Sequence, residues 1–351
     1  MLEVQKYLKI HTLDELETNF GIKYRLYDDR VVLNYNMIDS HSKYHPITLE
    51  CRGLILSLPD YSILCRSFDR FFNLGEGDEK QNNFNWKKCG IFNKLDGTLI
   101  NCYFDGKKWC VATRGTAFAE GKMPLGNSYF VLFNEAIGHD TTFFDTLNKE
   151  NTYIFELTSP ENRIVTKYFK TKITLLAIRN KTTGKYVDEV LSHVDSAESY
   201  SFNNPTDIKN FVESRDPMDE GCVCYDPSTD VRIKVKNSSY VAIHHLRGEN
   251  GITKKSIVTL LLKNEIDEYL THFVEDTKMV LPYVERYNQL KSDIIEKYEL
   301  YKDIVNQKEF ALKVKDFDFK PFLFSLRNGK ELKDMFVVEK VKQLLKYFEG
   351  L

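Results

Sequence analysis

One lysine, Lys94, stands between two apolar segments with strand signals, at a break formed by Asp96 and Gly97. An Asp-Gly pair favours a turn, so the break places this amine at the end of a strand. A covalent carrier needs an uncharged amine, yet free lysine has a pKa of about 10.4 and is protonated at neutral pH. The alternative is a hairpin turn that carries a solvated lysine.

Cationic side chains elsewhere supply what such a nucleophile needs. Lys234 and Lys236 are two residues apart in an apolar run, so strand alternation puts both on one face. With Arg52 and Arg70 they would favour the neutral form of Lys94, as burial does, and would neutralise a triphosphate as pyrophosphate leaves. The sequence therefore predicts an uncharged Lys94 facing a cationic pocket. The alternative is an exposed strand face with solvated lysines.

Carboxylates form the third part of the candidate site. Glu156 and Glu220 offer hard oxygen ligands that suit Mg²⁺, usually through water. Glu220 can equally be a solvated turn residue. Two roles are open for Asp96. One is catalytic, and the other is local, in which its carboxylate accepts a hydrogen bond from the amide of Gly97 or Thr98.

The order of these groups resembles a known set of motifs. In chain order they are Leu49-Glu-Cys-Arg-Gly53, Arg70-Phe-Phe-Asn-Leu74, Lys94-Leu-Asp-Gly-Thr98, Ser159-Pro-Glu-Asn-Arg-Ile-Val165 and Lys234-Val-Lys236. The set resembles the nucleotidyltransferase motifs of polynucleotide ligases and capping enzymes, and more closely the bacteriophage RNA ligase 1 family, the tRNA-repair ligases. The resemblance runs from about Tyr35 to Tyr240 and fades beyond it. Arg70 departs from the family, where a lysine stands, and replaces a point charge with a planar fork.

The resemblance implies a role for each residue. Lys94 would be the catalytic N6-AMP-lysine, with Glu156 and Tyr240 as further catalytic residues, and Glu220 and Asp267 would be linked to the metal. Tyr240 has a core-packing alternative, and Asp267 can be a surface acid of a helix. The residues that would bind the nucleotide are Tyr35, Arg52, Arg70, Lys234 and Lys236, and Glu156 in addition to its catalytic role.

The function implied by the resemblance is that of an ATP-dependent RNA ligase with Mg²⁺ as its metal and Mn²⁺ as an alternative. It would join RNA 3'-hydroxyl and 5'-phosphate ends through lysyl-AMP and RNA-adenylate, in tRNA broken in the anticodon loop. RNA, above all tRNA, is the expected partner, together with a separate polynucleotide kinase-phosphatase. The alternatives are a DNA ligase, a GTP-dependent capping enzyme, or a non-catalytic RNA-binding protein on the same fold.

The elements that must position these residues are mostly strands. Short runs of Val, Ile, Leu, Tyr and Phe bounded by Gly, Asp, Asn or Pro predict strands, and two helices lie among them at 129–137 and 207–214. Asp105-Gly106 and Asp226-Pro-Ser228 predict hairpins. The strands are expected at 31–36, 51–58, 90–94, 98–104, 108–114, 152–158, 173–179, 221–225 and 231–236.

The pattern changes after residue 236. Apolar residues from Tyr287 to Val305 recur at steps of three and four, as in an amphipathic helix, and 256–273 and 332–348 behave similarly. A domain boundary is expected in 246–253, and the expected fold class is α+β. Residues 1–245 would form the adenylyltransferase domain, which is a nucleotidyltransferase (ATP-grasp-like ligase) domain of antiparallel sheets with helices. Residues 246–351 would form an all-helical C-terminal domain that selects tRNA.

Composition excludes several other classes. The chain has 351 residues, and its 49 Lys and Arg against 51 Asp and Glu exclude a polycation that holds nucleic acid by bulk charge. Seven cysteines without a CxxC pair indicate reduced thiols in a cytoplasm, the host's if the protein is viral, and Cys222 and Cys224 are expected in a buried strand. No membrane span or signal peptide is expected.

Overall fold

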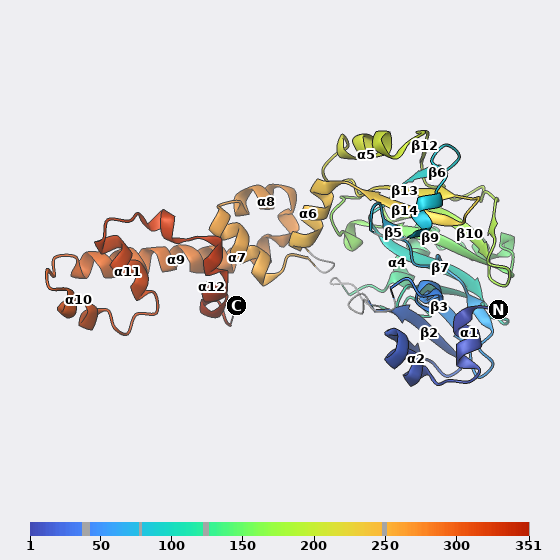
Figure 1. Ribbon diagram of the computed structural model, residues 1–351, viewed down its shortest axis with the longest axis horizontal. Coiled ribbons are helices and arrows are strands. Elements are labelled where there is room, and N and C mark those ends of the chain that lie inside the picture. The colour runs from blue at the N-terminus through green and yellow to red at the C-terminus, as the bar shows by residue number, and fades with distance from the viewer. Residues whose placement is uncertain (37–42, 77–78, 122–125, 248–250, 351) are drawn as a thin grey trace. The chain divides into compact units, whose positions relative to one another are not determined.

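The computed structural model describes residues 1–36, 43–76, 79–121, 126–247 and 251–350. It divides the chain into two compact units, Met1–His244 and His245–Leu351. Three residues of the expected boundary segment, 248–250, lie outside the described residues. Figure 1 shows strands with a few helices in the first unit and helices alone in the second.

A four-stranded antiparallel sheet, in the order β1-β2-β3-β4, opens the N-terminal unit. Its strands are β1 (Ile22–Leu26), β2 (Arg30–Tyr35), β3 (Arg52–Ser57) and β4 (Ile63–Cys65). Apolar residues of this sheet and of the neighbouring helices share one buried core. The helices are α1 (Glu3–Leu8), α2 (Leu13–Phe20) and α3 (Pro46–Glu50).

Two five-stranded sheets complete this unit, in the orders β11-β10-β9-β7-β8 and β12-β6-β13-β14-β5. The first contains β7 (Thr98–Phe104), β8 (Trp109–Thr113), β9 (Asn151–Thr158), β10 (Lys172–Asn180) and β11 (Tyr186–Val187). The second contains β5 (Phe72–Asn73), β6 (Gly90–Asn93), β12 (Ser199–Tyr200), β13 (Gly221–Asp226) and β14 (Val231–Lys236). Only the short β5 pairs in parallel, with β14, among the described strands.

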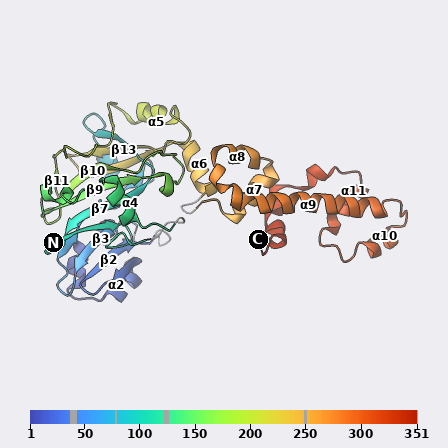
Figure 2. The ribbon, with the colours of Figure 1, turned by 180° about the vertical axis from the view of Figure 1, so that it is seen from behind.

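One helix packs on each of these two sheets. Phe133 of α4 (Tyr129–Ala136) joins the buried core of the first sheet, where Figure 2 shows this helix against β9 and β7. Ile208 of α5 (Pro205–Glu213) joins the core of the second. Because that core takes the buried residues at 231, 233 and 235, the three cations of β14 point away from it.

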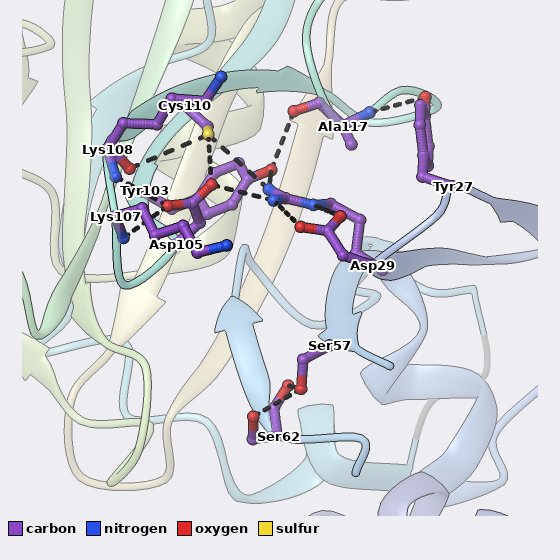
Figure 3. Close-up of polar contacts among 11 residues, drawn as sticks. Tyr27, Asp29, Ser57, Ser62, Tyr103, Asp105, Lys107, Lys108, Cys110 and Ala117 are labelled. Carbon is purple, nitrogen blue, oxygen red and sulfur yellow. Dashed lines mark hydrogen bonds and ion pairs between the residues drawn. The ribbon is translucent and has the colours of Figure 1, made fainter. Parts of the chain in front are cut away.

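A buried arginine links the four-stranded sheet to the β7–β8 hairpin (Figure 3). The guanidinium of Arg30, at the start of β2, donates to the hydroxyl of Tyr103 and to the carboxylate of Asp105, both at 2.9 Å. The guanidinium also donates two hydrogen bonds to the carboxylate of the preceding residue, Asp29, both at 2.7 Å. Since every one of these charges is matched, we assign the cluster a structural role.

The C-terminal unit is built of helices, and α6 begins seven residues before it. Their bounds are α6 (Ser238–Arg247), α7 (Lys254–Lys263), α8 (Ile266–His272), α9 (Thr277–Tyr301), α10 (Gln307–Lys313), α11 (Lys320–Arg327) and α12 (Val341–Tyr347). The predicted helix over 256–273 is two helices, because Asn264 adopts φ 61° and ends α7. The prediction for 332–348 is also wrong: two 3₁₀ turns precede the short α12.

The predicted fold class is confirmed. All nine predicted strands are present to within one residue at each end, and both hairpins pair as expected. The predicted apolar stripe from Tyr287 to Val305 is buried only as far as Ile294. Helix α9 ends at Tyr301, and Val305 beyond it is 91% exposed.

The cysteines carry free thiols, and Cys222 and Cys224 are buried in β13 as predicted. None of the described helices combines the length and apolar character that crossing a bilayer requires.

Candidate active site

Lys94 follows β6, and its backbone amide donates to the carbonyl of Gly221. Its Nζ lies 2.7 Å from Oε2 of Glu220, which precedes β13. The other oxygen of Glu220 lies 2.7 Å from Nζ of Lys236 at the end of β14. Three neighbouring strands (Figure 1) therefore bring two lysines onto one buried carboxylate.

The expectation of an uncharged Lys94 is wrong for the ligand-free protein. Burial lowers the pKa of this amine, but the opposing effect of the Glu220 carboxylate keeps its pKa above the ordinary value. The pKa of Glu220 is lowered, because Lys94 and Lys236 outweigh the opposing effect of burial. Lys94 is therefore an ammonium held by an ion pair until a ligand changes its surroundings.

Glu156 approaches the lysine from the other five-stranded sheet. It lies in β9, opposite Leu99 of β7, with 9% of its surface exposed. Burial raises its pKa to about 8, helped by Glu220 and opposed by Lys94. Near neutral pH this group is mostly protonated, and the site lies where the two five-stranded sheets meet.

Asp96 does not make the local turn bonds expected for it. Its Oδ2 accepts the backbone amides of Val165 and Thr166, both at 2.8 Å, and its Oδ1 accepts the hydroxyl of Tyr240 at 2.6 Å. Asp96 and Tyr240 are both buried. This carboxylate joins the break after Lys94 to a distant loop and to α6, which shows why a short acidic residue stands there.

The glycine beside Asp96 is required by packing. A Cβ on Gly97 would lie 2.4 Å from the carbonyl oxygen of Leu157 in β9. Only glycine lets the break after Lys94 approach that strand so closely.

A second cluster contains arginines, two of which each have a buried donor atom without a hydrogen-bond partner. The side chains of Arg52 and Arg70 each have a buried Nη1 with no hydrogen-bond partner in the described part of the chain. The Cζ of Arg70 lies 4.0 Å from the ring centroid of Tyr35, and that of Arg114 lies 4.4 Å from it. Buried donors without acceptors are costly, so this cluster fits an anion with several oxygens.

Arg114 is a member of this cluster that the sequence analysis did not single out. It follows β8, and its Nε donates to Oδ1 of Asn34 at 3.3 Å. The signal available in the sequence was an arginine followed by Gly115 at the end of a predicted strand. That pattern is weak, and only the fold brings Arg114 beside Tyr35.

Lys234 lies between the two clusters. Its Nζ is 4.6 Å from the ring centroid of Phe71, which also faces Arg52 at 5.4 Å. Burial, together with the charges of Arg52, Lys94 and Lys236, lowers the pKa of Lys234 to about 7. Lys234 therefore loses its proton more readily than Lys94.

The metal assignments stay predictions. Glu156 and Glu220 interact electrostatically with each other and with Lys94, whereas Asp267 is an exposed residue of α8 in the C-terminal unit. Within the described residues no group of three or more His, Cys, Asp and Glu side chains has the arrangement of a metal site. Two carboxylates fit Mg²⁺, which usually takes one or two of them and completes its shell with water and substrate phosphates.

Comparisons with known proteins point to one family. The model of a family described as RNA ligase matches residues 50–240. A protein of Autographa californica nuclear polyhedrosis virus, named a bifunctional polynucleotide kinase/RNA ligase, is 30% identical over 95% of this chain and 50% of its own. An RNA ligase of Rhodothermus phage RM378 is 25% identical over 89% of this chain and 88% of its own. The chain thus spans about half the length of the viral relative.

Among solved structures, an archaeal ATP-dependent RNA ligase has a TM-score of 0.48 and 14% identity, covering 75% of this chain and 68% of its own. A Naegleria gruberi RNA ligase mutant with AMP and Mn has a TM-score of 0.42 and 13% identity, covering 51% of this chain and 58% of its own.

Proposed function

Because the chain belongs to the RNA ligase family, we propose that it is an ATP-dependent ligase that joins an RNA 3'-hydroxyl to an RNA 5'-phosphate. The observation that carries this proposal is the pairing of Lys94 and Lys236 on Glu220. Beside that pair, Arg52 and Arg70 keep buried donors without partners. The arrangement offers a nucleophile and a place for a polyanion.

In the first step, Nζ of Lys94 attacks the α-phosphorus of ATP, so an N–P bond forms and the bond to pyrophosphate breaks. The ammonium first gives up a proton, and Glu220, whose Oε2 accepts a hydrogen bond from Nζ at 2.7 Å, would receive it. Arg52, Arg70 and Lys234 would hold the outer phosphates and offset the charge that develops on the leaving group.

In the second step, an oxygen of the RNA 5'-phosphate attacks the phosphorus of lysyl-AMP. The N–P bond breaks, Lys94 regains a proton, and RNA-adenylate forms. In the third step, the RNA 3'-hydroxyl attacks the 5'-phosphate, loses its proton, and releases AMP. Glu156 would contact the ribose, and Tyr35 would lie near the nucleotide.

Mg²⁺ or Mn²⁺ would be held through water by Glu156 and Glu220. When bound, the ion would neutralise charge on the phosphates. Loss of a proton from Glu156 would accompany its binding, because this group is mostly protonated near pH 7 in the ligand-free protein.

Residues 1–245 would form the adenylyltransferase domain, and the helical unit after it would select tRNA with a broken anticodon loop, whose unpaired bases are accessible. A separate polynucleotide kinase-phosphatase would prepare the RNA ends, in a cytoplasm. The viral relative is named as both a kinase and a ligase, which supports a kinase partner.

A joining assay with 5'-phosphorylated, single-stranded RNA tests the proposal. The expected result is a ligated or circular product with ATP and Mg²⁺, and none with 5'-hydroxyl RNA. Joining of nicked DNA in preference would indicate a DNA ligase, and labelling by GTP alone would indicate a capping enzyme. RNA binding without a covalent adduct would indicate a non-catalytic protein.

A further inference from the structure

A cavity in the N-terminal unit borders the cluster of Arg52, Arg70 and Arg114, here called the phosphate cluster. Its volume is about 360 Å³, which is within the range of small-ligand sites. The residues that line it include Arg70, Phe71, Asn83, Tyr186, Asp230 and Arg232.

The cavity and the candidate active site share residues. Arg70 lines the cavity, and its guanidinium stacks on Tyr35 in the cluster. Phe71 lines the cavity too, and its ring faces Lys234 and Arg52. A ligand that leaves the cluster past Arg70 therefore enters the cavity.

A row of cations on β14 leads the same way. Lys236, Lys234 and Arg232 occupy one face of the strand, and residues two apart are about 7 Å from each other. Lys236 shares Glu220 with the nucleophile, and Arg232 lines the cavity. The row therefore runs from the reacting phosphorus to the cavity.

The stereochemistry of the reaction determines which ligand this row of cations guides. Attacking and leaving groups lie roughly in line at phosphorus. Pyrophosphate leaves opposite Lys94 in the first step, and the RNA 5'-phosphate must displace Lys94 from that same side in the second. The RNA 5'-phosphate thus enters where the outer phosphates were, beside Arg52 and Arg70. We propose that the cavity binds the nucleoside attached to that 5'-phosphate, an inference that rests on the proposed function.

The lining suits a nucleoside. The Cζ of Arg232 lies 3.9 Å from the ring centroids of both Tyr186 and Tyr225, so aromatic rings hold the guanidinium in place. Its Nη1 lies 3.6 Å from Oδ1 of Asp230, which is longer than a hydrogen bond, so its N–H groups can still donate to a ligand. Asn83 is exposed and carries an amide that can pair with the edge of a base. Unpaired RNA bases are recognised by aromatic rings, guanidinium planes and such polar edges.

The acidic lining residue next to Arg70 does not oppose a phosphorylated ligand. Both oxygens of Asp69 accept from Arg179 at 2.9 Å, so its charge is already matched. The other acidic lining residue, Asp230, lies 3.6 Å from Nη1 of Arg232, so Arg70, a member of the phosphate cluster, is the lining cation without an ion-pair partner among the described residues.

The test separates the steps of the reaction in the full chain. Lysyl-AMP formation is measured with ATP alone, and AMP transfer is then measured in a single turnover with 5'-phosphorylated RNA. For Arg232→Gln, the loss in AMP transfer should exceed any loss in lysyl-AMP formation by about tenfold. Asn83→Ala, at an exposed position, should show the same selective loss to a smaller extent if Arg232→Gln fails to fold. Arg25→Gln, a 56% exposed arginine of the same unit, is the matched control.

A donor RNA whose 5'-terminal ribose lacks a base identifies the ligand. The wild type should transfer AMP to this donor about tenfold more weakly, and Arg232→Gln should lose little more. Equal transfer to both donors by the wild type, or an equal loss of both steps in Arg232→Gln, would overturn the cavity assignment while leaving the ligase proposal intact. A wild type that forms no lysyl-AMP would overturn both.

Discussion

Nζ of Lys94 lies 2.7 Å from Oε2 of Glu220, so the proposed nucleophile is an ammonium in an ion pair before nucleotide binds. Burial alone would lower the pKa of this lysine, but the facing Glu220 carboxylate raises it. Activation must therefore include transfer of a proton out of this ion pair.

Glu220→Gln should be deficient in lysyl-AMP formation and less stable. It removes the partner of Lys94 and Lys236, and a buried donor left unpaired costs about 1–3 kcal/mol. Urea denaturation should show a loss of this size at neutral pH. The loss should shrink in acid, because the lowered pKa of Glu220 stabilises the fold only above the pH at which the carboxylate protonates. Unchanged stability relative to the exposed control Glu189→Gln would contradict the ion-pair account.

Glu156→Gln should remove a pH dependence of stability. The pKa of Glu156 is about 8 in the folded protein and about 4.3 when unfolded, so between these values the folded form binds more protons. The free energy of unfolding of the wild type should then fall as pH rises, by at most about 1.4 kcal/mol per pH unit. Denaturation at about pH 5.5 and about pH 8.5 should show the variant gaining on the wild type toward high pH. A constant difference would contradict the raised pKa.

Binding of a non-hydrolysable ATP analogue should take up a proton. Lys234 has a pKa of about 7, so near pH 8 it is mostly neutral, and a triphosphate favours its charged form. Calorimetry in buffers of different ionisation enthalpy should detect up to about one proton per site. The uptake should vanish in Lys234→Met and persist in the exposed control Lys185→Met. Uptake that is unchanged in Lys234→Met would assign the proton to another group.

The strands and the candidate residues could be predicted because both leave local patterns. The alternation of β14 placed Lys234 and Lys236 on one face, and the Asp-Gly break ended the strand at Lys94. The charge of Lys94 could not be predicted, because Glu220 lies 126 residues away and reaches it only through sheet pairing. The expectation weighed burial and cations, and it left out the pairing of Lys94 with Glu220, which decides the pKa.

Arg114 and the contacts of Asp96 were missed for the same reason. Arg114 joins Tyr35 because the end of β8 lies beside β2, to which Asn34 ties it. Asp96 bonds residues of a loop 69 and 70 positions away, and no local pattern marks that loop as its partner.

Tyr240→Phe and Asp96→Asn should each destabilise the fold, and their effects should not add. The hydroxyl of Tyr240 donates to Asp96 at 2.6 Å, so either change breaks one buried bond, at about 1–2 kcal/mol. A double-mutant cycle by urea denaturation should give a coupling of about 1 kcal/mol. Additive effects would show that Tyr240 acts independently of Asp96. Tyr298→Phe, a half-buried tyrosine of α9, is the control.

The most direct test of the account is to map the residue that carries AMP. The protein is mixed with ATP and Mg²⁺, digested, and its peptides are analysed by mass spectrometry. The account predicts one AMP on the side chain of Lys94, lost in Lys94→Ala and kept in Lys185→Met. AMP on a different lysine, or an adduct that survives in Lys94→Ala, would contradict it.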